Sequence, residues 1–322
     1  MTTVFRSEQR ASWLKRVLWR PIGRAALRVG QGRGPIGLRA LALRRGAFPY
    51  LRAKDEPFEQ ELEHGVFVGG TRDMLSLYVR TFGVWEPYLS AFVRARLSPG
   101  DVFVDVGANT GWYTLLAASS VAPGGHVVAV EASAAIVEQL ERQLHRNDVT
   151  NVRIVQEAVS DHEGRVELEL GPAEHTGMTK AVADAANGTG VPCRPLPQML
   201  HDDEWARVRL VKIDVEGAEF AAVKGLAPSL SRLPHDAEVV VEVGAQRTAE
   251  RSAVRDLFAV FEEAGYRGYA APNGYEVEDY LAYSPRRAFP RIDAATVTGQ
   301  VDVVFSRLGG DELPVDRNRP PT

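Results

Sequence analysis

Five short apolar runs lie in the middle of the chain, each between turn residues. Their length and their richness in valine are typical of strands that a parallel sheet buries on both faces. We therefore predict five buried strands. They are Val102–Val106, His126–Val130, Val152–Val155, Val208–Ile213 and Glu238–Val243.

Apolar residues recur at helical spacing between these runs. The clearest segments are Trp112–Ser119, Ala134–Arg146, Glu219–Gly225 and Arg251–Ala264. Strands that alternate with helices predict crossover connections, and therefore an α/β fold in which helices cover both faces of a parallel sheet. Two later runs, Gly265–Ala270 and Asp302–Phe305, have no clear helix between them and predict an antiparallel pair at the sheet edge.

The distribution of charged and apolar residues along the chain predicts one domain with two appendages. Mixed charge and regular apolar spacing extend from residue 58 to residue 308 without an internal repeat. Residues 309–322 are rich in glycine, proline, aspartate and arginine, and we expect them to be disordered. Residues 1–57 form a basic N-terminal extension, for which we expect a helical conformation.

Charge is distributed unevenly between this extension and the rest of the chain. Residues 1–54 contain 13 lysines and arginines and the single acid Glu8, whereas the remaining residues contain 25 bases and 41 acids. Apolar residues at helical spacing predict a basic amphipathic helix around residues 14–25, which Pro21 breaks or restarts. Such an arm has three alternative positions: on an anionic membrane surface, folded back on the acidic body, or extended in solvent.

Composition narrows the class of protein. Hydrophobic residues make up 45% and charged residues 25% of the chain, values that do not favour a disordered or fibrous protein. Cys193 is the only cysteine, which rules out an internal disulfide and favours a reducing, cytoplasmic location. The longest apolar runs are far shorter than the roughly 20 residues of a membrane-spanning helix, so we expect at most peripheral contact with a membrane.

Two motifs at strand ends predict a nucleoside site, because ligands of doubly wound sheets bind beyond the carboxyl ends of the strands. The first is Asp105–Gly111, where glycines let the backbone pass close to a ligand and a helix begins at once. The second is Glu131, which follows the second strand 20 residues beyond Gly111. An acid at this position is placed to accept hydrogen bonds from both ribose hydroxyls.

The glycine spacing narrows the choice of nucleoside. The loop has the form G-x-x-x-G, so it lacks the middle glycine of a dinucleotide fingerprint and the lysine of a P-loop. Asp105 would repel a pyrophosphate but would hold an ammonium group by a charge-assisted bond. A ligand with ribose at one end and an amino acid at the other is S-adenosylmethionine. The alternative is a tight strand-to-helix turn that Asn109 caps.

Two further strand ends carry polar residues. Glu157 and Ala158 follow the third strand, where they would contact the adenine amino edge or form only a surface turn. Asp214, Glu216 and Glu219 lie within six residues after the fourth strand. Like charges held this close cost free energy unless a proton, a cation or a substrate relieves them. Glu219 has the alternative role of favouring the dipole of the helix that it opens.

Together these motifs resemble the FkbM-type family of S-adenosylmethionine-dependent methyltransferases. The resemblance covers roughly half of the chain and runs over GVWEP, SPGDVFVDVGANTGWYT, VVAVEA, NVRIVQEAVSDHEG, VRLVKIDVEGAE and VVVEVG. It implies a Rossmann-like class I fold with seven strands ordered 3-2-1-4-5-7-6, and methylation of a hydroxyl group. One departure is Pro195–Leu200, which stands where family members commonly have a threonine-leucine-aspartate run.

The resemblance also implies a cofactor site made of the motif residues carried over by position. These are Glu86, Asp105, Gly107, Ala108, Asn109, Thr110, Gly111, Glu131, Ala132, Glu157 and Ala158. The glycine loop would line the methionine end, Glu131 would bind the ribose, and Glu157 with Ala158 the adenine. Asp214 would sit between the cofactor and the acceptor.

We predict an O-methyltransferase that acts on a small hydroxylated molecule, such as a sugar, a glycolipid or a polyketide-like metabolite. A neutral hydroxyl is a weak nucleophile, so we expect a general base, with Asp214, Glu216 and His175 as candidates. His175 lies in Gly171–Val191, whose composition suits a loop that covers a substrate. Mg²⁺ held by these carboxylates and Glu242 is an alternative that we do not favour, and we assign no metal ligands.

Two other functions stay open at this stage. A nicotinamide-dependent oxidoreductase would also use Glu131, although the missing middle glycine argues against it. A nucleoside-binding protein without catalysis would use the basic arm as a tether. We expect a small-molecule partner and no nucleic acid. Acceptor choice is expected to lie in Gly171–Val191 and Pro272–Thr298. The tyrosines near the second region either line a pocket or fill a core; they are Tyr269, Tyr275, Tyr280 and Tyr283.

Overall fold

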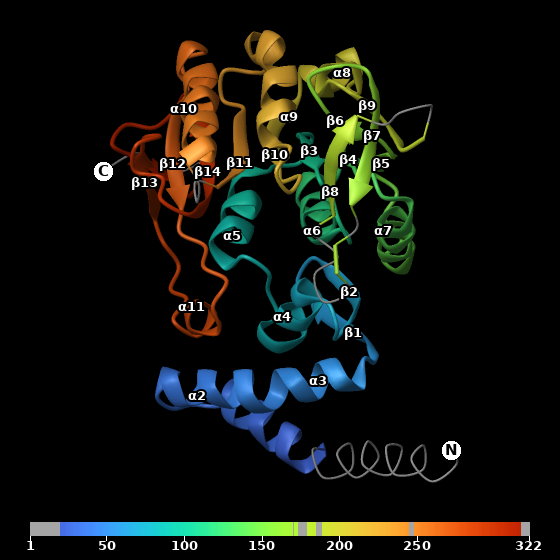
Figure 1. Cartoon of the computed structure of the whole chain (residues 1–322), viewed down its shortest axis with the longest axis vertical. Coiled ribbons are helices and arrows are strands. Elements are labelled where there is room, and N and C mark those ends of the chain that lie inside the picture. The colour runs from blue at the N-terminus through green and yellow to red at the C-terminus, as the bar shows by residue number, and fades with distance from the viewer. Residues whose placement is uncertain (1–19, 170, 173–178, 185–188, 245–247, 317–322) are drawn as a thin grey trace.

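The structure, a computed structural model, describes residues 20–169, 171–172, 179–184, 189–244 and 248–316. A central sheet with helices on both faces fills most of the molecule, and further helices lie at one end of its long axis (Figure 1). The sheet has nine strands in the order β15-β13-β12-β14-β11-β10-β3-β4-β5. The strands are β3 (Val102–Val106), β4 (His126–Val130), β5 (Val152–Val155), β10 (Val208–Ile213), β11 (Glu238–Gly244), β12 (Arg267–Ala271), β13 (Ala288–Ile292), β14 (Gln300–Ser306) and β15 (Glu312–Pro314).

The five predicted parallel strands are confirmed, four of them with the predicted bounds and β11 one residue longer. All four predicted helices are also present. Helices that cover the sheet are α5 (Pro87–Arg96), α6 (Trp112–Val121), α7 (Ala134–Arg146), α8 (Asp202–Trp205), α9 (Glu219–Leu226) and α10 (Thr248–Glu263), with the 3-10 turns η3 (Leu196–Gln198) and η4 (Ala227–Arg232).

The strand order confirms one prediction and corrects another. The seven predicted strands are arranged β5-β4-β3-β10-β11-β14-β12, which is the order 3-2-1-4-5-7-6 when they are numbered along the chain. The sheet nevertheless has nine strands, since β13 and β15 extend it beyond β12, so the β12–β14 pair is not at the edge. Pro290 interrupts the apolar pattern of β13. It lies outside the two residues of β13 that pair with β12, Arg291 and Ile292, so that ladder does not need the N–H group that proline lacks.

Part of the C-terminal tail is ordered, which corrects the prediction of disorder for residues 309–322. β15 pairs with β13, with Leu313 opposite Phe289. Both side chains are buried. The polar composition of the tail hid this strand, because its order depends on one apolar side chain and on a partner strand distant in sequence.

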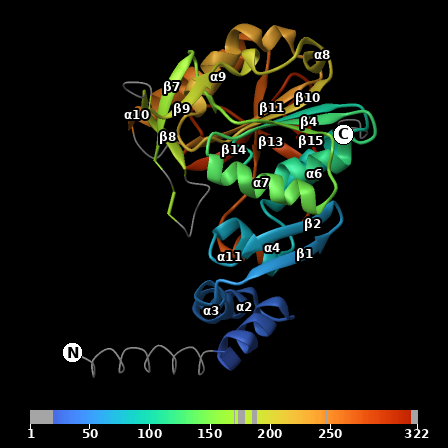
Figure 2. The same cartoon turned by 90° about the vertical axis from the view of Figure 1, so that its right-hand side faces the viewer.

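Side chains of the central strands alternate between two faces of the sheet. Val102, Val104 and Val106 belong to one apolar cluster with residues of α9 and α10, whereas Phe103 belongs to a second cluster with residues of α5, α6 and α7. Figure 2 shows α9 on one side of the sheet and α6 and α7 on the other. Period-two alternation along a strand produces this division, and it also directs Asp105 to the side of Phe103.

A second sheet of four short strands was not predicted. It has the order β6-β9-β7-β8 and consists of β6 (Ala158–Val159), β7 (Gly164–Glu169), β8 (Lys180–Asp184) and β9 (Val191–Arg194). Residues 180–184 therefore form a strand rather than part of a covering loop. Most side chains of β7 are exposed or half-buried, so its sequence lacks the apolar run that marks a central strand.

The basic N-terminal arm folds back on the body in its described part. Residues 20–31 are helical, with Pro21 in the first turn of the described part of this helix, and α2 (Ile36–Ala42), a π-helical turn η1 (Leu43–Ala47) and α3 (Phe48–Lys54) follow. Leu43 and Phe48 share an apolar cluster with Tyr78 and Tyr280 of the body. Arg44 forms ion pairs with two body acids, Glu276 and Glu278. Of the three positions considered, contact with the body is thus the one that α2 and α3 adopt.

Four small elements connect the arm to the sheet. They are the hairpin β1 (Pro57–Leu62) and β2 (Gly65–Gly70), the helix α4 (Met74–Phe82) and, from a distant part of the chain, α11 (Val277–Leu281). Among the described residues, no helix has both the length and the apolar character needed to cross a bilayer.

Candidate active site

The loop after β3 passes directly against the end of β10. Gly107 has a φ of 79°, and a Cβ atom there would lie 1.8 Å from the Asp214 carbonyl oxygen. Glycine alone meets both requirements without strain. The N–H groups of Gly107 and Ala108 donate to the Val130 carbonyl oxygen at 2.9 and 3.0 Å. The loop is therefore fixed at the carboxyl edge of the sheet, where ligands of doubly wound folds bind.

Glu131 is held by the backbone on both oxygens. Its Oε2 accepts the N–H of Asn109 at 3.1 Å and its Oε1 accepts the N–H of Ser133 at 2.9 Å. Asn109 has a φ of 49°, a left-handed conformation that asparagine tolerates better than most residues. Burial raises the pKa of Glu131, and the backbone N–H groups oppose that shift. Each carboxylate oxygen keeps a second lone pair, so Glu131 can still accept ribose hydroxyls.

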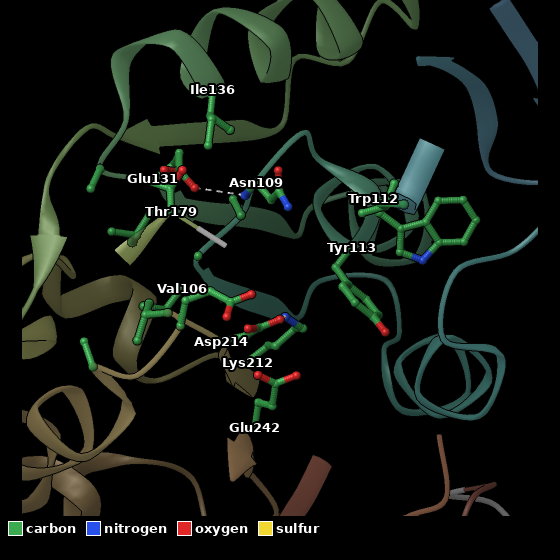
Figure 3. A pocket seen from close by; sticks show the side chains of 18 of the residues that line it. Val106, Asn109, Trp112, Tyr113, Glu131, Ile136, Thr179, Lys212, Asp214 and Glu242 are labelled. Atoms are coloured by element: carbon green, nitrogen blue, oxygen red, sulfur yellow. Dashed lines mark hydrogen bonds and ion pairs between the residues drawn. The ribbon is translucent and has the colours of Figure 1, made fainter. Parts of the chain in front are cut away.

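A cavity of about 370 Å³ opens at this edge of the sheet. Glu131 and Asn109 lie at one end of it, and Lys212, Asp214 and Glu242 lie at the other (Figure 3). Ten of the 14 predicted site residues line the cavity. They are Glu86, Gly107, Ala108, Asn109, Glu131, Ala132, Glu157, Ala158, Asp214 and Glu216.

The other predicted site residues have different surroundings. Asp105 is 1% exposed and its Oδ2 accepts the Thr114 hydroxyl at 2.6 Å, so its carboxylate lies beneath the loop, on the α6 side of the sheet. Thr110 is also buried. Gly111 begins α6, and a Cβ there would lie 2.5 Å from a methyl carbon of Leu140, which indicates a role in helix packing. His175 lies outside the described residues.

The second sheet supplies the apolar part of the cavity near Ala158. Leu168 of β7 and Ala181 of β8 line this part together with Ile136. Glu157, predicted near the adenine, is paired with Arg194 of β9 at 2.8 Å. An apolar wall beside a strand end was not predicted, because the residues that form it lie in three separate segments of the chain.

Lys212 is a candidate functional residue that sequence reasoning missed. Its side chain is 4% exposed, its Nζ lies 2.7 Å from Asp214 Oδ2, and it lies 4.9 Å above the centre of the Tyr113 ring. Burial lowers the pKa of Lys212, but the nearby carboxylates of Asp214, Asp105 and Glu86 together raise it above the ordinary lysine value. The signal in the sequence was a lysine within an otherwise apolar strand, because a buried lysine requires a partner.

Two tyrosines connect the acids at this end of the cavity. The Tyr113 hydroxyl donates to Glu86 Oε2 at 2.5 Å, and the Tyr275 hydroxyl lies 2.8 Å from Glu86 Oε1 and 3.1 Å from Glu242 Oε1. Burial and the nearby charge of Asp214 raise the pKa of Glu242 to about 10. Glu242 is therefore protonated at neutral pH and can donate its proton to the Tyr275 oxygen.

Asp302 adds a further acid behind this network. It is buried and accepts the Asn273 side-chain amide at 2.7 Å. Burial and the nearby Glu86 raise the pKa of Asp302 well above its usual range. Among the described residues that line the cavity, Lys212 is the only lysine or arginine, so negative or neutral acids outnumber cations at this end.

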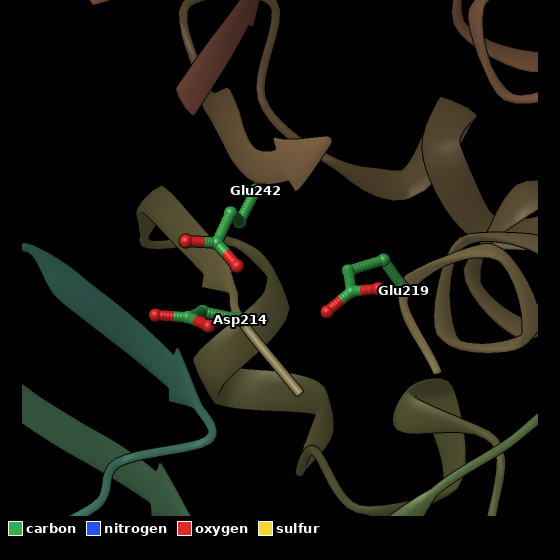
Figure 4. A group of neighbouring side chains, drawn as sticks. All are labelled: Asp214, Glu219 and Glu242. Carbon is green, nitrogen blue, oxygen red and sulfur yellow. The ribbon is translucent and has the colours of Figure 1, made fainter. Parts of the chain in front are cut away.

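Asp214, Glu219 and Glu242 approach one another closely enough to hold a metal ion, with one oxygen from each within 4.8 Å of the others (Figure 4). Each carboxylate nevertheless has a protein partner. Glu219 accepts the N–H groups of Val215 and Gly217 at 3.0–3.1 Å, Asp214 is paired with Lys212, and Glu242 bonds with Tyr275. Each of the three carboxylates thus has a protein partner on at least one oxygen, and we assign no metal ligands.

Glu216 follows Asp214 by two residues and also lines the cavity. It has a φ of 50°, and burial together with the charge of Asp214 raises its pKa to about 7. A left-handed residue with a perturbed pKa in a cavity is typical of a functional position.

The site is that of a class I S-adenosylmethionine-dependent methyltransferase. An acid follows the second strand of a Rossmann-like sheet, as in folds that bind a ribose there, and the loop beside it has neither the dinucleotide nor the P-loop pattern of glycines. Residues 105–267, half of the chain, match the Methyltransferase FkbM domain. The chain belongs to this family, as the sequence motifs indicated, and the oxidoreductase and non-catalytic alternatives are not retained.

Other known proteins are similar to parts of the chain. An arsenite methyltransferase of Halobacterium salinarum is 26% identical over 175 residues, which are 53% of this chain and 39% of that protein. The chain thus spans less than half the length of this curated relative. A methyltransferase FkbM of Methylobacillus flagellatus superposes with a TM-score of 0.43 and 14% identity, covering 88% of this chain and 58% of that one. Fibrillarin of Aeropyrum pernix, solved with natively bound S-adenosyl-L-methionine, has a TM-score of 0.38 and 12% identity over 77% of this chain and 93% of its own.

Proposed function

We propose that this methyltransferase acts on a hydroxyl group of a small molecule and that Asp214 receives the hydroxyl proton. The observation that carries the proposal is the position of Asp214. Its carbonyl oxygen adjoins Gly107 of the cofactor loop, while its carboxylate faces Lys212 and Glu242. Asp214 thus lies between the part of the cavity that we assign to the cofactor and a wall of polar side chains.

The first part of the cavity suits S-adenosylmethionine. Glu131 keeps lone pairs for two ribose hydroxyls, and Ile136 and Leu168 offer apolar surface to an adenine ring beside Ala158. The cofactor supplies the methyl group as part of a sulfonium cation. The carboxylate groups of Asp214 and Glu216 line the cavity on this side, and negative charge on them favours a cation there.

Asp214 suits the role of general base. Transfer from a sulfonium needs the acceptor oxygen held in line with the methyl carbon, and such orientation is worth roughly 7–11 kcal/mol. A positioned base that takes the hydroxyl proton adds a factor of about 10² to 10⁴. Lys212 bonds to Oδ2 of Asp214, so we assign Oδ1 to the acceptor. Glu216, whose pKa of about 7 also suits a general base, is the second candidate; we prefer Asp214 because it adjoins Gly107 of the glycine loop.

The polar wall indicates the class of acceptor. Glu242 carries a proton at neutral pH, and Gln300 and Tyr275 line the same region. These groups both donate and accept hydrogen bonds, as recognition of several neighbouring hydroxyls requires. We therefore favour a sugar or a sugar-bearing molecule over an aromatic or polyketide acceptor.

Binding measurements test the cofactor part of the proposal. Isothermal titration of the full chain with S-adenosylmethionine and its demethylated product is expected to show binding that Glu131→Gln weakens at least about tenfold, because ribose then loses a charged acceptor. Glu163→Gln, on the surface, is the matched control. Normal binding by the Glu131 variant would refute this assignment of the ribose.

Transfer measurements test the chemistry. With labelled cofactor and a panel of polyhydroxylated, phenolic and amine acceptors, we expect label in an oxygen-linked methyl group. Asp214→Asn is expected to lower kcat by about 10² or more with little change in cofactor affinity. Asp203→Asn, at an exposed position of helix α8, is the control. A methyl group found only on carbon or nitrogen would overturn the proposal.

A further inference from the structure

Exposed apolar side chains are concentrated on the N-terminal arm. Seven large apolar side chains are exposed among the described residues, and five of them lie between residues 22 and 41. They are Ile22, Val29, Ile36, Leu38 and Leu41. Leu38 and Ile22 are 58% and 57% exposed. Scattered exposed leucines are common on proteins, but this concentration within 20 residues marks an interaction surface.

The helix formed by residues 20–31 has two apolar stripes, and only one of them packs on the protein. Gly23 and Gly30 belong to the stripe that packs on the protein, and both are buried. A Cβ atom at Gly23 would lie 2.2 Å from Tyr50 and one at Gly30 would lie 2.3 Å from Leu43, so this stripe fits closely on the following helices. Ile22, Ala25 and Val29 have the spacing i, i+3, i+7 and form the second stripe. All three are exposed, so the body of the protein leaves this stripe uncovered.

The charge of the arm is of one sign. Residues 20–54 contain nine lysines and arginines and no acid. Arg44 and Lys54 form ion pairs with acids outside this range. The arginines at 20, 24, 28, 33 and 45 are exposed and flank the apolar side chains. This combination suits a partner whose surface is anionic and whose interior is apolar. The arginines would meet the anionic surface, and the apolar side chains would enter the interior.

We propose that residues 20–47 dock the enzyme on an anionic phospholipid membrane. The arm forms one end of the long axis of the molecule in both views, so this end can approach a flat surface without hindrance from the sheet domain (Figures 1 and 2). A bilayer accepts single protruding side chains such as Leu38 and Leu41 without a matching pocket, whereas a protein partner would need one. Anionic headgroups meet the exposed arginines.

The docking surface is connected to the cavity through shared side chains. Met74 and Trp85 pack against the apolar cluster that holds the arm, and both also line the cavity. Trp85 lies 5.7 Å from the Tyr275 ring. If the proposed function holds, docking brings the acceptor region close to the lipid surface, and the acceptor is a hydroxylated molecule held at a membrane.

Vesicle sedimentation tests the docking. The full chain is mixed with vesicles of phosphatidylcholine alone or with phosphatidylglycerol added. We expect binding to the anionic vesicles at least about tenfold stronger than to the neutral ones and weakened by salt, since exposed charges are screened. Leu38→Asp with Leu41→Asp, and separately Arg24→Glu with Arg28→Glu, are expected to reduce it at least about tenfold.

Controls keep this test decisive. Leu308→Asp and Arg142→Glu are matched substitutions at exposed sites outside the arm and should bind vesicles like the wild type. Unchanged S-adenosylmethionine affinity in every variant shows that the fold is intact.

Equal binding to neutral and anionic vesicles, or arm variants that bind like the wild type, would overturn the proposal. Concentration-dependent dimerisation abolished by the leucine variant would assign the surface to a second copy instead. Failure of methyl transfer with intact vesicle binding would count only against the proposed function.

Discussion

Lys212 and Asp214 form an ion pair of 2.7 Å at the end of the central strand β10. Residues two apart on a strand point to the same side, so the pair is built into the local sequence. The surroundings of the pair depend on the tertiary structure. The buried Lys212 lies within reach of the acids Asp105 and Glu86, and the partly exposed Asp214 carboxylate lies in the cavity.

Loss of this cation is expected to destabilise the enzyme. Lys212→Met leaves the surrounding carboxylates uncompensated, and we expect the free energy of unfolding to fall by about 3 kcal/mol at pH 8, with methyl transfer reduced at least about 10²-fold. Urea unfolding and initial rates measure the two effects. Lys224→Met removes a surface ion pair with Asp161 and should change stability by less than about 1 kcal/mol. Equal effects of the two variants would contradict the assigned role of Lys212.

Stability is expected to fall as pH rises above the ordinary range of a glutamate. The pKa of Glu242 is about 10 in the folded protein and 4.5 as its ordinary value, so between these pH values the native state holds a proton that the unfolded state has lost. The free energy of unfolding then decreases with pH, by at most about 1.4 kcal/mol per unit for this group. Glu242→Gln should flatten the slope between pH 6 and pH 9, and Glu163→Gln should leave it unchanged. An unaltered slope in the Glu242 variant would show that this carboxyl is ionised in the fold.

Cofactor affinity is expected to depend on pH through Glu216. Its pKa of about 7 means that it gains negative charge between pH 6 and pH 8, and a negative group in the cavity attracts a cationic cofactor. The KM for S-adenosylmethionine should therefore fall several-fold over this range. Glu216→Gln should remove the change near pH 7 and leave kcat within about threefold. Persistence of the same inflection in the variant would assign the titration to another group.

The close approach of the cofactor loop to β10 is expected to forbid any side chain at residue 107. Gly107→Ala adds a methyl group 1.8 Å from the Asp214 carbonyl oxygen at a positive φ, so we expect a loss of about 3 kcal/mol or more in stability and loss of cofactor binding. Gly217 also has a positive φ, of 95°, but nothing lies within 4 Å of its Cβ position. Gly217→Ala should therefore cost only about 1 kcal/mol. Thermal unfolding with and without cofactor distinguishes the two.

Much of the fold was predictable because its signals are local. Valine-rich runs bounded by turns marked β3, β4, β5, β10 and β11, and the motif around Gly107 with Glu131 marked one half of the cavity. The second sheet and β15 were not predictable, since their exposed or single apolar residues gain order only from partners distant in the chain.

The sequence by itself determined the parallel core, the glycine loop after β3 and the place of Glu131 at the end of β4, because each depends on residues that are neighbours in the chain. Tertiary structure decided which groups meet at the other end of the cavity. Glu86, Tyr113, Lys212, Glu242 and Tyr275 come from five segments, and only packing brings them into contact. It also fixed the basic arm on the body. Burial then shifted the pKa values of these titratable groups. Desolvation acts on a group only when distant segments of the chain pack around it and exclude water.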